Sequence, residues 1–318
     1  MHQTHGPVFR EFYKERDVVR EERRMRIESS PQGQLVEALS ATAFAAHPYK
    51  NSPAGWASDI ENLRATDAEA FYKRYYAPSN LTIGIAGDVN PAEAKKLAER
   101  YFGRIPGRPA PPVVNTVEPP QSGEKRVMVA SPAQPFLVVA YKRPDQYSKD
   151  NAALDVLEQI LSGGRTSIIY KEMVRDKKIA LGAASYATYP GGKYPGLFLF
   201  FVVPNSGHTV EEMEKSVYEI IDRVKKEKPD AEALQRVKTN LRAALIQKLD
   251  SNSGLAAELC SYQASYGDWR KLFTELDEYN RVTAEDVQRV AQTYLLENTR
   301  TVVYTYTPAK EAAKGDAK

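Results

Sequence analysis

The stretch ERDVVREERR, residues 15–24, decides how this sequence is interpreted. It lies within residues 7–30, whose composition and spacing predict a helix. Glu15 and Glu22 are seven residues apart, which is close to two helical turns, so both carboxylates leave the same face. Apolar side chains lie on or beside that face: Phe12, Val19 and Met25. Two carboxylates in a half-apolar stripe need a cation, a proton or a metal as a partner.

The same stretch has a plainer interpretation. Its arginines alternate with acidic residues, and Glu22 with Arg26 has the i,i+4 spacing of a favourable ion pair. A solvated, salt-bridged helix is therefore an alternative to a site.

Length and composition limit the classes of protein. A chain of 318 residues with 42% hydrophobic and 27% charged residues predicts about two globular domains with a sizeable core. Its 44 basic and 41 acidic residues are intermixed, which does not support nucleic-acid binding. The single cysteine, Cys260, excludes an intrachain disulfide. Neither a membrane span nor a secretory signal is visible.

An internal repeat predicts two similar units. Thr66 opens a predicted helix that leads through Asn80 into a predicted strand at 81–87, and Thr283 does the same before Asn298 and a strand at 299–306. The offset is 217 residues at the threonines and 218 at the asparagines. If the second unit starts near residue 124, the equivalent start lies about 93 residues before Met1. We therefore expect the first unit to lack its opening strands, which would leave 81–87 with an unpaired edge unless another chain covers it.

The remaining patterns give a domain plan. Six prolines between Pro106 and Pro120 predict an extended linker. We expect four segments: 1–105, the end of the first domain; 106–123, the linker; 124–307, the second domain; and 308–318, a disordered tail.

Periodicity predicts the elements within this plan. Ser30, Thr209 and Thr283 are predicted helix N-caps, and Thr66 with Glu69 is a predicted capping box. Predicted helices cover 7–30, 31–46, 59–63, 66–77, 91–102, 148–162, 167–175, 210–227, 231–249, 254–265, 269–279 and 284–295. Predicted strands cover 81–87, 125–130, 135–143, 181–189, 196–203 and 299–306.

The opening stretch resembles the downstream half of the zinc site in the pitrilysin/insulinase family of metallopeptidases, which includes mitochondrial processing peptidase. Three further segments carry the resemblance: HPYKNSPAGW at 47–56, FYKRYYAPSNLTIGIAGD at 71–88 and LSGGRTSIIYKEMVRDKKIAL at 161–181. The resemblance implies an α+β protein of two homologous α/β units of the mitochondrial-processing-peptidase-like metallohydrolase fold. In relatives these units close around an unfolded peptide; here the first lacks its N-terminal part.

Matched residue by residue, the resemblance makes Glu22 the third zinc ligand and Glu15 the second catalytic carboxylate. The family's other two ligands and its general base come from an HxxEH motif, which this sequence lacks. His2 and His5 have no adjacent glutamate and lie only 17 to 20 residues before Glu22. The family's geometry requires a far longer separation, so these histidines do not replace the HxxEH motif. Zn2+ is thus expected in intact relatives, with an incomplete site here.

Relatives also use an arginine and a tyrosine from the second half to grip substrate. Arg175 matches the arginine, whereas the tyrosine position falls on Leu181. The alternative for Arg175 is a cation at a helix C-terminus, favoured by the helix dipole.

The resemblance implies a zinc-endopeptidase-like protein that acts on peptides or unfolded polypeptides but is inactive alone. The alternative is a non-catalytic peptide-binding or partner subunit. Either version allows a homo- or heterodimer with an HxxEH-bearing relative. The sequence does not indicate the compartment, although intact bacterial relatives are often periplasmic.

Overall fold

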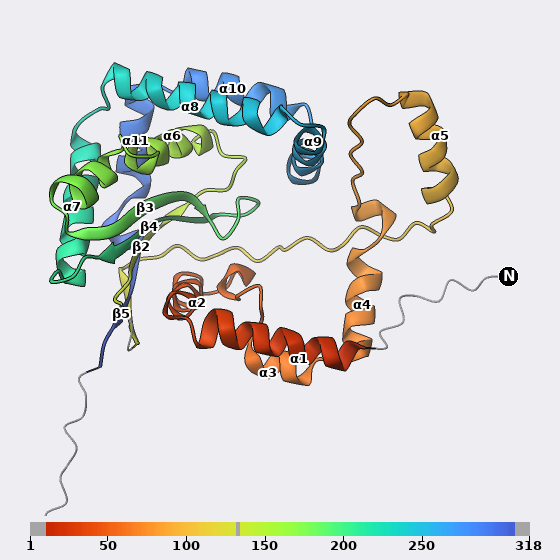
Figure 1. The fold of residues 1–318 in the computed structure, drawn as a ribbon, viewed down its shortest axis with the longest axis horizontal. Helices are drawn as coiled ribbons and strands as arrows, with labels where there is room; N and C mark the ends of the chain where they lie inside the picture. Colours follow the sequence, from red (N-terminus) through yellow and green to blue (C-terminus); the bar gives the residue numbers. More distant parts are fainter. Residues whose placement is uncertain (1–10, 132–133, 309–318) are drawn as a thin grey trace, which may run out of the picture. The chain divides into compact units, whose positions relative to one another are not determined.

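The structure, a computed structural model, describes residues 11–131 and 134–308 (Figure 1). The start of the first predicted helix, both N-terminal histidines and nearly all of the predicted tail lie outside these residues. The chain forms two compact units that interleave along the sequence. Unit 1 comprises residues up to Glu22, Ala54–Asn115 and Thr239–Asn280; unit 2 comprises Arg23–Pro53, Thr116–Lys238 and residues from Arg281 onward.

Unit 2 is built on a five-stranded mixed sheet with the order β1-β5-β2-β4-β3. Its strands are those predicted from the sequence, within a few residues: β1 (Lys125–Ala130), β2 (Leu137–Arg143), β3 (Ala180–Tyr189), β4 (Gly196–Pro204) and β5 (Arg300–Tyr306). β1 runs parallel to β5, and every other neighbouring pair is antiparallel. The last strand in the chain is therefore flanked on both sides, by β1 and β2.

One face of this sheet is covered by helix α2 (Pro31–Ala43). Ser30 caps the helix as predicted, because its Oγ accepts a hydrogen bond from the Gly33 N–H at 3.1 Å. Leu35, Leu39 and Ala43 recur at the i,i+4 spacing that puts them on one helix face, and each is at most 1% exposed. Together with apolar side chains of the sheet they form a core cluster: Phe44, Val138, Ala140, Leu197, Leu199 and Val303.

The other helices of unit 2 pack on strands β2, β3 and β4 and on one another: α6 (Asn151–Ser162), α7 (Val210–Lys226) and α11 (Ala284–Tyr294). The last two begin at the predicted caps. Thr209 accepts a hydrogen bond from the Glu212 N–H, and Thr283 from the Asp286 N–H. Strand β2 is buried from Leu137 to Tyr141, which explains its continuous apolar sequence.

Unit 1 is helical. It contains α3 (Ala57–Asn62), α4 (Ala65–Tyr75), α5 (Pro91–Phe102), α9 (Asn252–Tyr266) and nearly all of α10 (Lys271–Arg281), with most of α1 (Phe12–Arg23) and part of α8 (Ala231–Leu249). The predicted capping box at Thr66 is wrong, because α4 starts one residue earlier and the Asp67 carboxylate accepts the Arg64 N–H at 2.9 Å.

The predicted strand at 81–87 is also wrong. The segment does not form a β-strand, and among the residues that the structure describes no strand pairs with it. Its sequence has the composition of a strand, but a strand is defined by a ladder of hydrogen bonds to a neighbour. The segment follows a short 3₁₀ turn, Pro78–Asn80.

Two helical segments depart from regular geometry. After Arg23 the first helix continues as a π-helix, Arg24–Glu28, so regular α-helical geometry ends at Arg23. A second π-helix, Tyr170–Asp176, occupies most of the helix predicted at 167–175. Two more 3₁₀ turns occur at Pro48–Lys50 and Glu297–Thr299. No helix in the described part of the chain is both long enough and apolar enough to cross a membrane.

Candidate functional site

Helix α1 carries both glutamates predicted for the site. Glu15 lies in its first turn and is exposed, and Glu22 lies near its end and is half-buried. The helix is regular from Phe12 to Arg23, so the seven-residue spacing places the two carboxylates on one face, as predicted.

Two arginines of α1, Arg20 and Arg23, are engaged by carboxylates from other segments. Arg20 Nε lies 2.8 Å from Glu61 Oε1, and Arg23 donates to both oxygens of Glu37 at 2.8 and 3.0 Å. The Arg23 side chain is only 5% exposed, so this bidentate pair is the stronger of the two. Helix α1 therefore has the ion pairs of the salt-bridged helix that the sequence allowed as an alternative, and it also carries the two glutamates.

The residues that the structure describes do not fit a complete zinc site. Among them, no group of three histidine, cysteine, aspartate or glutamate side chains is placed to hold a metal ion, whereas a catalytic zinc needs three protein ligands. Both described histidines have structural contacts. His47 is buried, and its Nδ1 accepts the Tyr49 N–H; His208 Nδ1 lies 2.8 Å from Glu212. His2 and His5 lie outside the described residues.

Arg175 belongs to unit 2 and lies in the second π-helix. Its guanidinium is exposed and lies 2.6 Å from the Asp176 carboxylate. This hydrogen bond raises the pKa of Arg175 and lowers that of Asp176. Leu181, where the resemblance leads us to expect a tyrosine, is 60% exposed on β3, an edge strand of the sheet.

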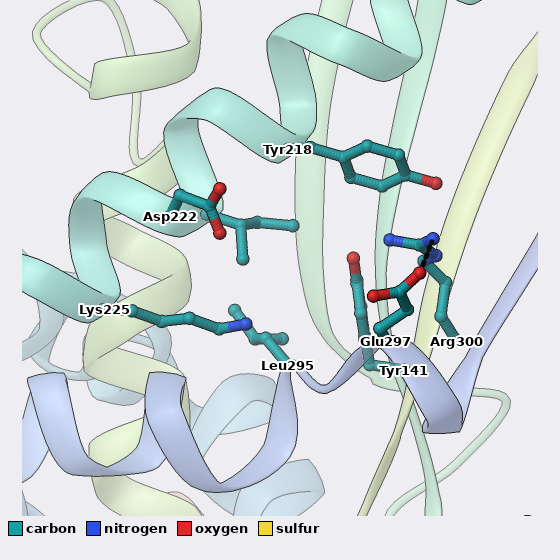
Figure 2. A pocket seen from close by; sticks show the side chains of 8 residues that line it. Tyr141, Tyr218, Asp222, Lys225, Leu295, Glu297 and Arg300 are labelled. Atoms are coloured by element: carbon teal, nitrogen blue, oxygen red, sulfur yellow. Dashed lines mark hydrogen bonds and ion pairs between the residues drawn. The ribbon is translucent and has the colours of Figure 1, made fainter. Parts of the chain in front are cut away.

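A hollow of about 310 Å³ in unit 2 is a site that the sequence did not indicate. Figure 2 shows side chains of α7 on one side of it and those around the start of β5 on the other. Acidic and basic groups are balanced in its lining, which comprises Tyr141, Tyr218, Ile221, Asp222, Lys225, Leu295, Glu297 and Arg300.

The charges around this hollow pair with one another. Arg300 is held by Glu124 and Glu297, and Tyr218 donates to Glu214 at 2.5 Å. Burial raises the pKa of Tyr218, and the hydrogen bond to Glu214 raises it further. Burial lowers the pKa of Lys225. The tyrosine hydroxyl stays protonated at neutral pH and the network is charge-balanced, so its chemistry is that of a structural ion-pair cluster.

Comparison with known proteins places this fold in a family. The sequence profile of the "Peptidase M16 inactive domain" matches residues 62–241. The chain is 30% identical to the zinc protease PqqE of Helicobacter pylori over 298 residues, which are 92% of this chain and 66% of that protein. It is 22% identical to a probable mitochondrial-processing peptidase subunit beta of Arabidopsis thaliana, over 89% of this chain and 54% of that protein. The chain therefore spans less than two thirds of these curated relatives.

Solved structures agree with the sequence matches. A protease from Helicobacter pylori superposes with a TM-score of 0.88 at 29% identity, covering 95% of this chain and 73% of that one. A peptidase M16 inactive domain from Pseudomonas fluorescens superposes with a TM-score of 0.81 at 20% identity, covering 93% and 70%. These matches confirm the predicted fold class and the pitrilysin/insulinase resemblance. Because the profile match covers more than half of the chain, this protein belongs to the peptidase M16 family.

Proposed function

We propose that this chain supplies the glutamate ligand of a zinc-peptidase site but not its two histidine ligands, and that it does not hydrolyse peptides alone. In this proposal Glu22 is one metal ligand, Glu15 is the second carboxylate of the site, and Arg175 contacts the substrate. Relatives are named zinc proteases, which supports zinc as the metal of the intact site.

The observation that carries the proposal is the pair of carboxylates on α1 in a sequence without HxxEH. One carboxylate ligand cannot hold a zinc ion in the three-ligand arrangement that leaves a position open for water. Two missing ligands would have to come from a polypeptide that carries HxxEH. The ion pairs of Arg20 and Arg23 with Glu61 and Glu37 help to fix the helix that presents Glu22.

The test is reconstitution. The purified chain is assayed for bound zinc and for cleavage of an unstructured peptide, alone and after co-expression with the part of the Helicobacter pylori zinc protease that lies outside its match to this chain. We expect neither zinc nor cleavage alone, and both in the complex. Stoichiometric zinc and cleavage by the chain alone would refute the proposal.

A matched pair of variants tests the role of Glu22 in the complex. Glu22→Gln removes the ligand charge, and we expect at least about a 100-fold loss of cleavage together with loss of zinc. Glu21→Gln removes an exposed neighbouring charge and should leave both unchanged. Equal losses in the two variants would show that Glu22 acts through charge alone and not as a ligand.

A non-catalytic partner subunit is the second candidate function. Two observations favour it: leucine stands at position 181, where the family resemblance expects a tyrosine, and some relatives are named as subunits of larger assemblies, such as cytochrome b-c1 complex subunit 1 of Homo sapiens. In the same co-expression experiment this function predicts a stable complex whose cleavage is unaffected by Glu22→Gln.

A further inference from the structure

The internal repeat extends beyond the two threonines to the order of the elements. Shifted by the 217 residues that separate Thr66 from Thr283, α1, α2, α3 and α4 start within about four residues of α8, α9, α10 and α11. The same shift brings the segment 81–87 onto β5, starting two residues before it. The segment therefore occupies the position in the first repeat that β5 occupies in the second.

The contacts of the repeated helices agree with this correspondence. In unit 2, α2 covers the sheet that contains β5. In unit 1, α9 lies against 81–87: a Cβ added to Gly84 would come within 2.6 Å of Cys260 Sγ and 2.8 Å of the Ala256 carbonyl oxygen. Shifted by 217 residues, Leu39 falls on Ala256 and Ala43 falls on Cys260. In unit 2, Leu39 and Ala43 belong to the same core cluster as Val303 of β5, so the two helix positions lie on the strand side of the helix in both units.

The strand positions differ in their neighbours. β5 is flanked by β1, which is parallel, and by β2, which is antiparallel, and its Val302 and Val303 are fully buried. Within the part of the chain that the structure describes, 81–87 has neither neighbour.

The side chains of 81–87 alternate as those of a strand do. Gly84 and Ala86 are partly covered, whereas Leu81, Ile83 and Ile85 are 58%, 56% and 55% exposed. Three large apolar side chains on one face of an extended segment are unusual at a surface that nothing covers, because their burial is strongly favourable. An extended segment without neighbours also leaves its backbone groups available for pairing.

We propose that the segment 81–87 is the central strand of a sheet that is completed by a second polypeptide segment, which supplies a parallel strand on one side and an antiparallel strand on the other. The occupant is built like residues 125–226 of this chain, with two flanking strands and a helix to cover Leu81, Ile83 and Ile85. A second copy of this chain is not the occupant, because its own β1 and β2 are already paired with β5. The proposal concerns assembly and holds whether or not the complex cleaves peptides.

The test measures docking and not catalysis. The chain is co-expressed with a tagged fragment of the Helicobacter pylori zinc protease, the part outside its match to this chain, and amide hydrogen exchange is compared with that of the chain alone. We expect a one-to-one complex in which the amides of 82–86 exchange at least about 100-fold more slowly, because they enter two ladders. The amides of β5, already paired on both sides, should not change and serve as the internal control.

Two variants locate the surface. Replacing Ile83 and Ile85 together by Asp should reduce the amount of bound fragment at least tenfold, whereas Val113→Asp, at an exposed apolar residue elsewhere in unit 1, should not. Glu22→Gln should bind the fragment normally, which separates failure of docking from failure of the proposed function. Three results would overturn the inference: no co-purification, a complex without protection of 82–86, or a dimer of the chain alone in which 82–86 is already protected.

Discussion

Glu118 gives the sharpest test of how the Pro-rich segment is held in unit 2. Its carboxylate accepts three backbone hydrogen bonds, from the N–H groups of Ala45 at 2.7 Å, Ala46 at 3.0 Å and His47 at 2.9 Å, and lies 3.3 Å from Lys142 Nζ. Burial alone would raise the pKa of Glu118, but these donors and the ammonium outweigh it and lower the pKa to about 2. The charged carboxylate therefore stabilises the turn after α2.

The magnitude follows from the pKa. A fall from 4.5 to about 2 corresponds to about 3 kcal/mol of folding free energy, because each pKa unit is worth about 1.4 kcal/mol. Since the folded-state pKa of Glu118 is the lower one, this stability is fully present above pH 4.5 and is lost as the pH falls toward 2. We expect Glu118→Gln to cost about 3 kcal/mol at pH 7 and only about 1 kcal/mol at pH 3.

The assay is urea unfolding followed by circular dichroism at both pH values. Tryptophan fluorescence separately reports on unit 1, because Trp56 and Trp269 both lie there. Glu99→Gln, at an exposed glutamate of α5, is the matched control and should change stability by less than about 0.5 kcal/mol at either pH. If Glu118→Gln costs as much at pH 3 as at pH 7, the carboxylate charge is not what stabilises the turn.

Three further substitutions test the packing. Leu39→Ala, in the core between α2 and the sheet, should cost about 2–5 kcal/mol in urea unfolding, whereas Leu97→Ala, exposed on α5, should cost less than about 0.5 kcal/mol. Gly84→Val should destabilise unit 1, measured by tryptophan fluorescence, because a Cβ at position 84 meets α9. Gly107→Val is the control and should have little effect, because a Cβ at position 107 meets nothing within 4 Å. Equal effects of the two substitutions would contradict the contact. Arg143→Ala removes a guanidinium that is 1% exposed and hydrogen-bonded to two backbone carbonyls. We expect it to lower the free energy of unfolding, measured by urea unfolding, by more than about 1 kcal/mol, and a smaller loss would show that these bonds contribute little.

The sequence predicted elements whose signals are local. Ser30, Thr209 and Thr283 cap helices as predicted, because a cap is decided by a hydroxyl and an N–H three residues apart. The strands of unit 2 were also predicted, since their apolar runs are bounded by turns and breaks. Glu15 and Glu22 share a helix for the same local reason.

Properties that depend on distant residues were missed. The segment 81–87 has the sequence of a strand, but pairing depends on neighbours that the described chain does not provide. Both π-helices escaped prediction, because their sequences, RMRIE at Arg24–Glu28 and YKEMVRD at Tyr170–Asp176, contain ordinary helix formers. The cluster of Glu124, Arg126, Glu214 and Arg300 joins residues far apart in sequence.

The repeat explains why equivalent helices differ in burial. On α2, Leu39 and Ala43 are at most 1% exposed; on α9, whose residues are all described, no side chain is buried, including the equivalent Ala256 and Cys260. The helix position is the same in both repeats, so the difference arises from the layer beneath it, which is five paired strands for α2 and a single extended segment for α9. A helix buries its apolar face fully only against a complete layer. The low burial of α9 therefore agrees with the lack of paired strands beside 81–87 in the part of the chain that the structure describes.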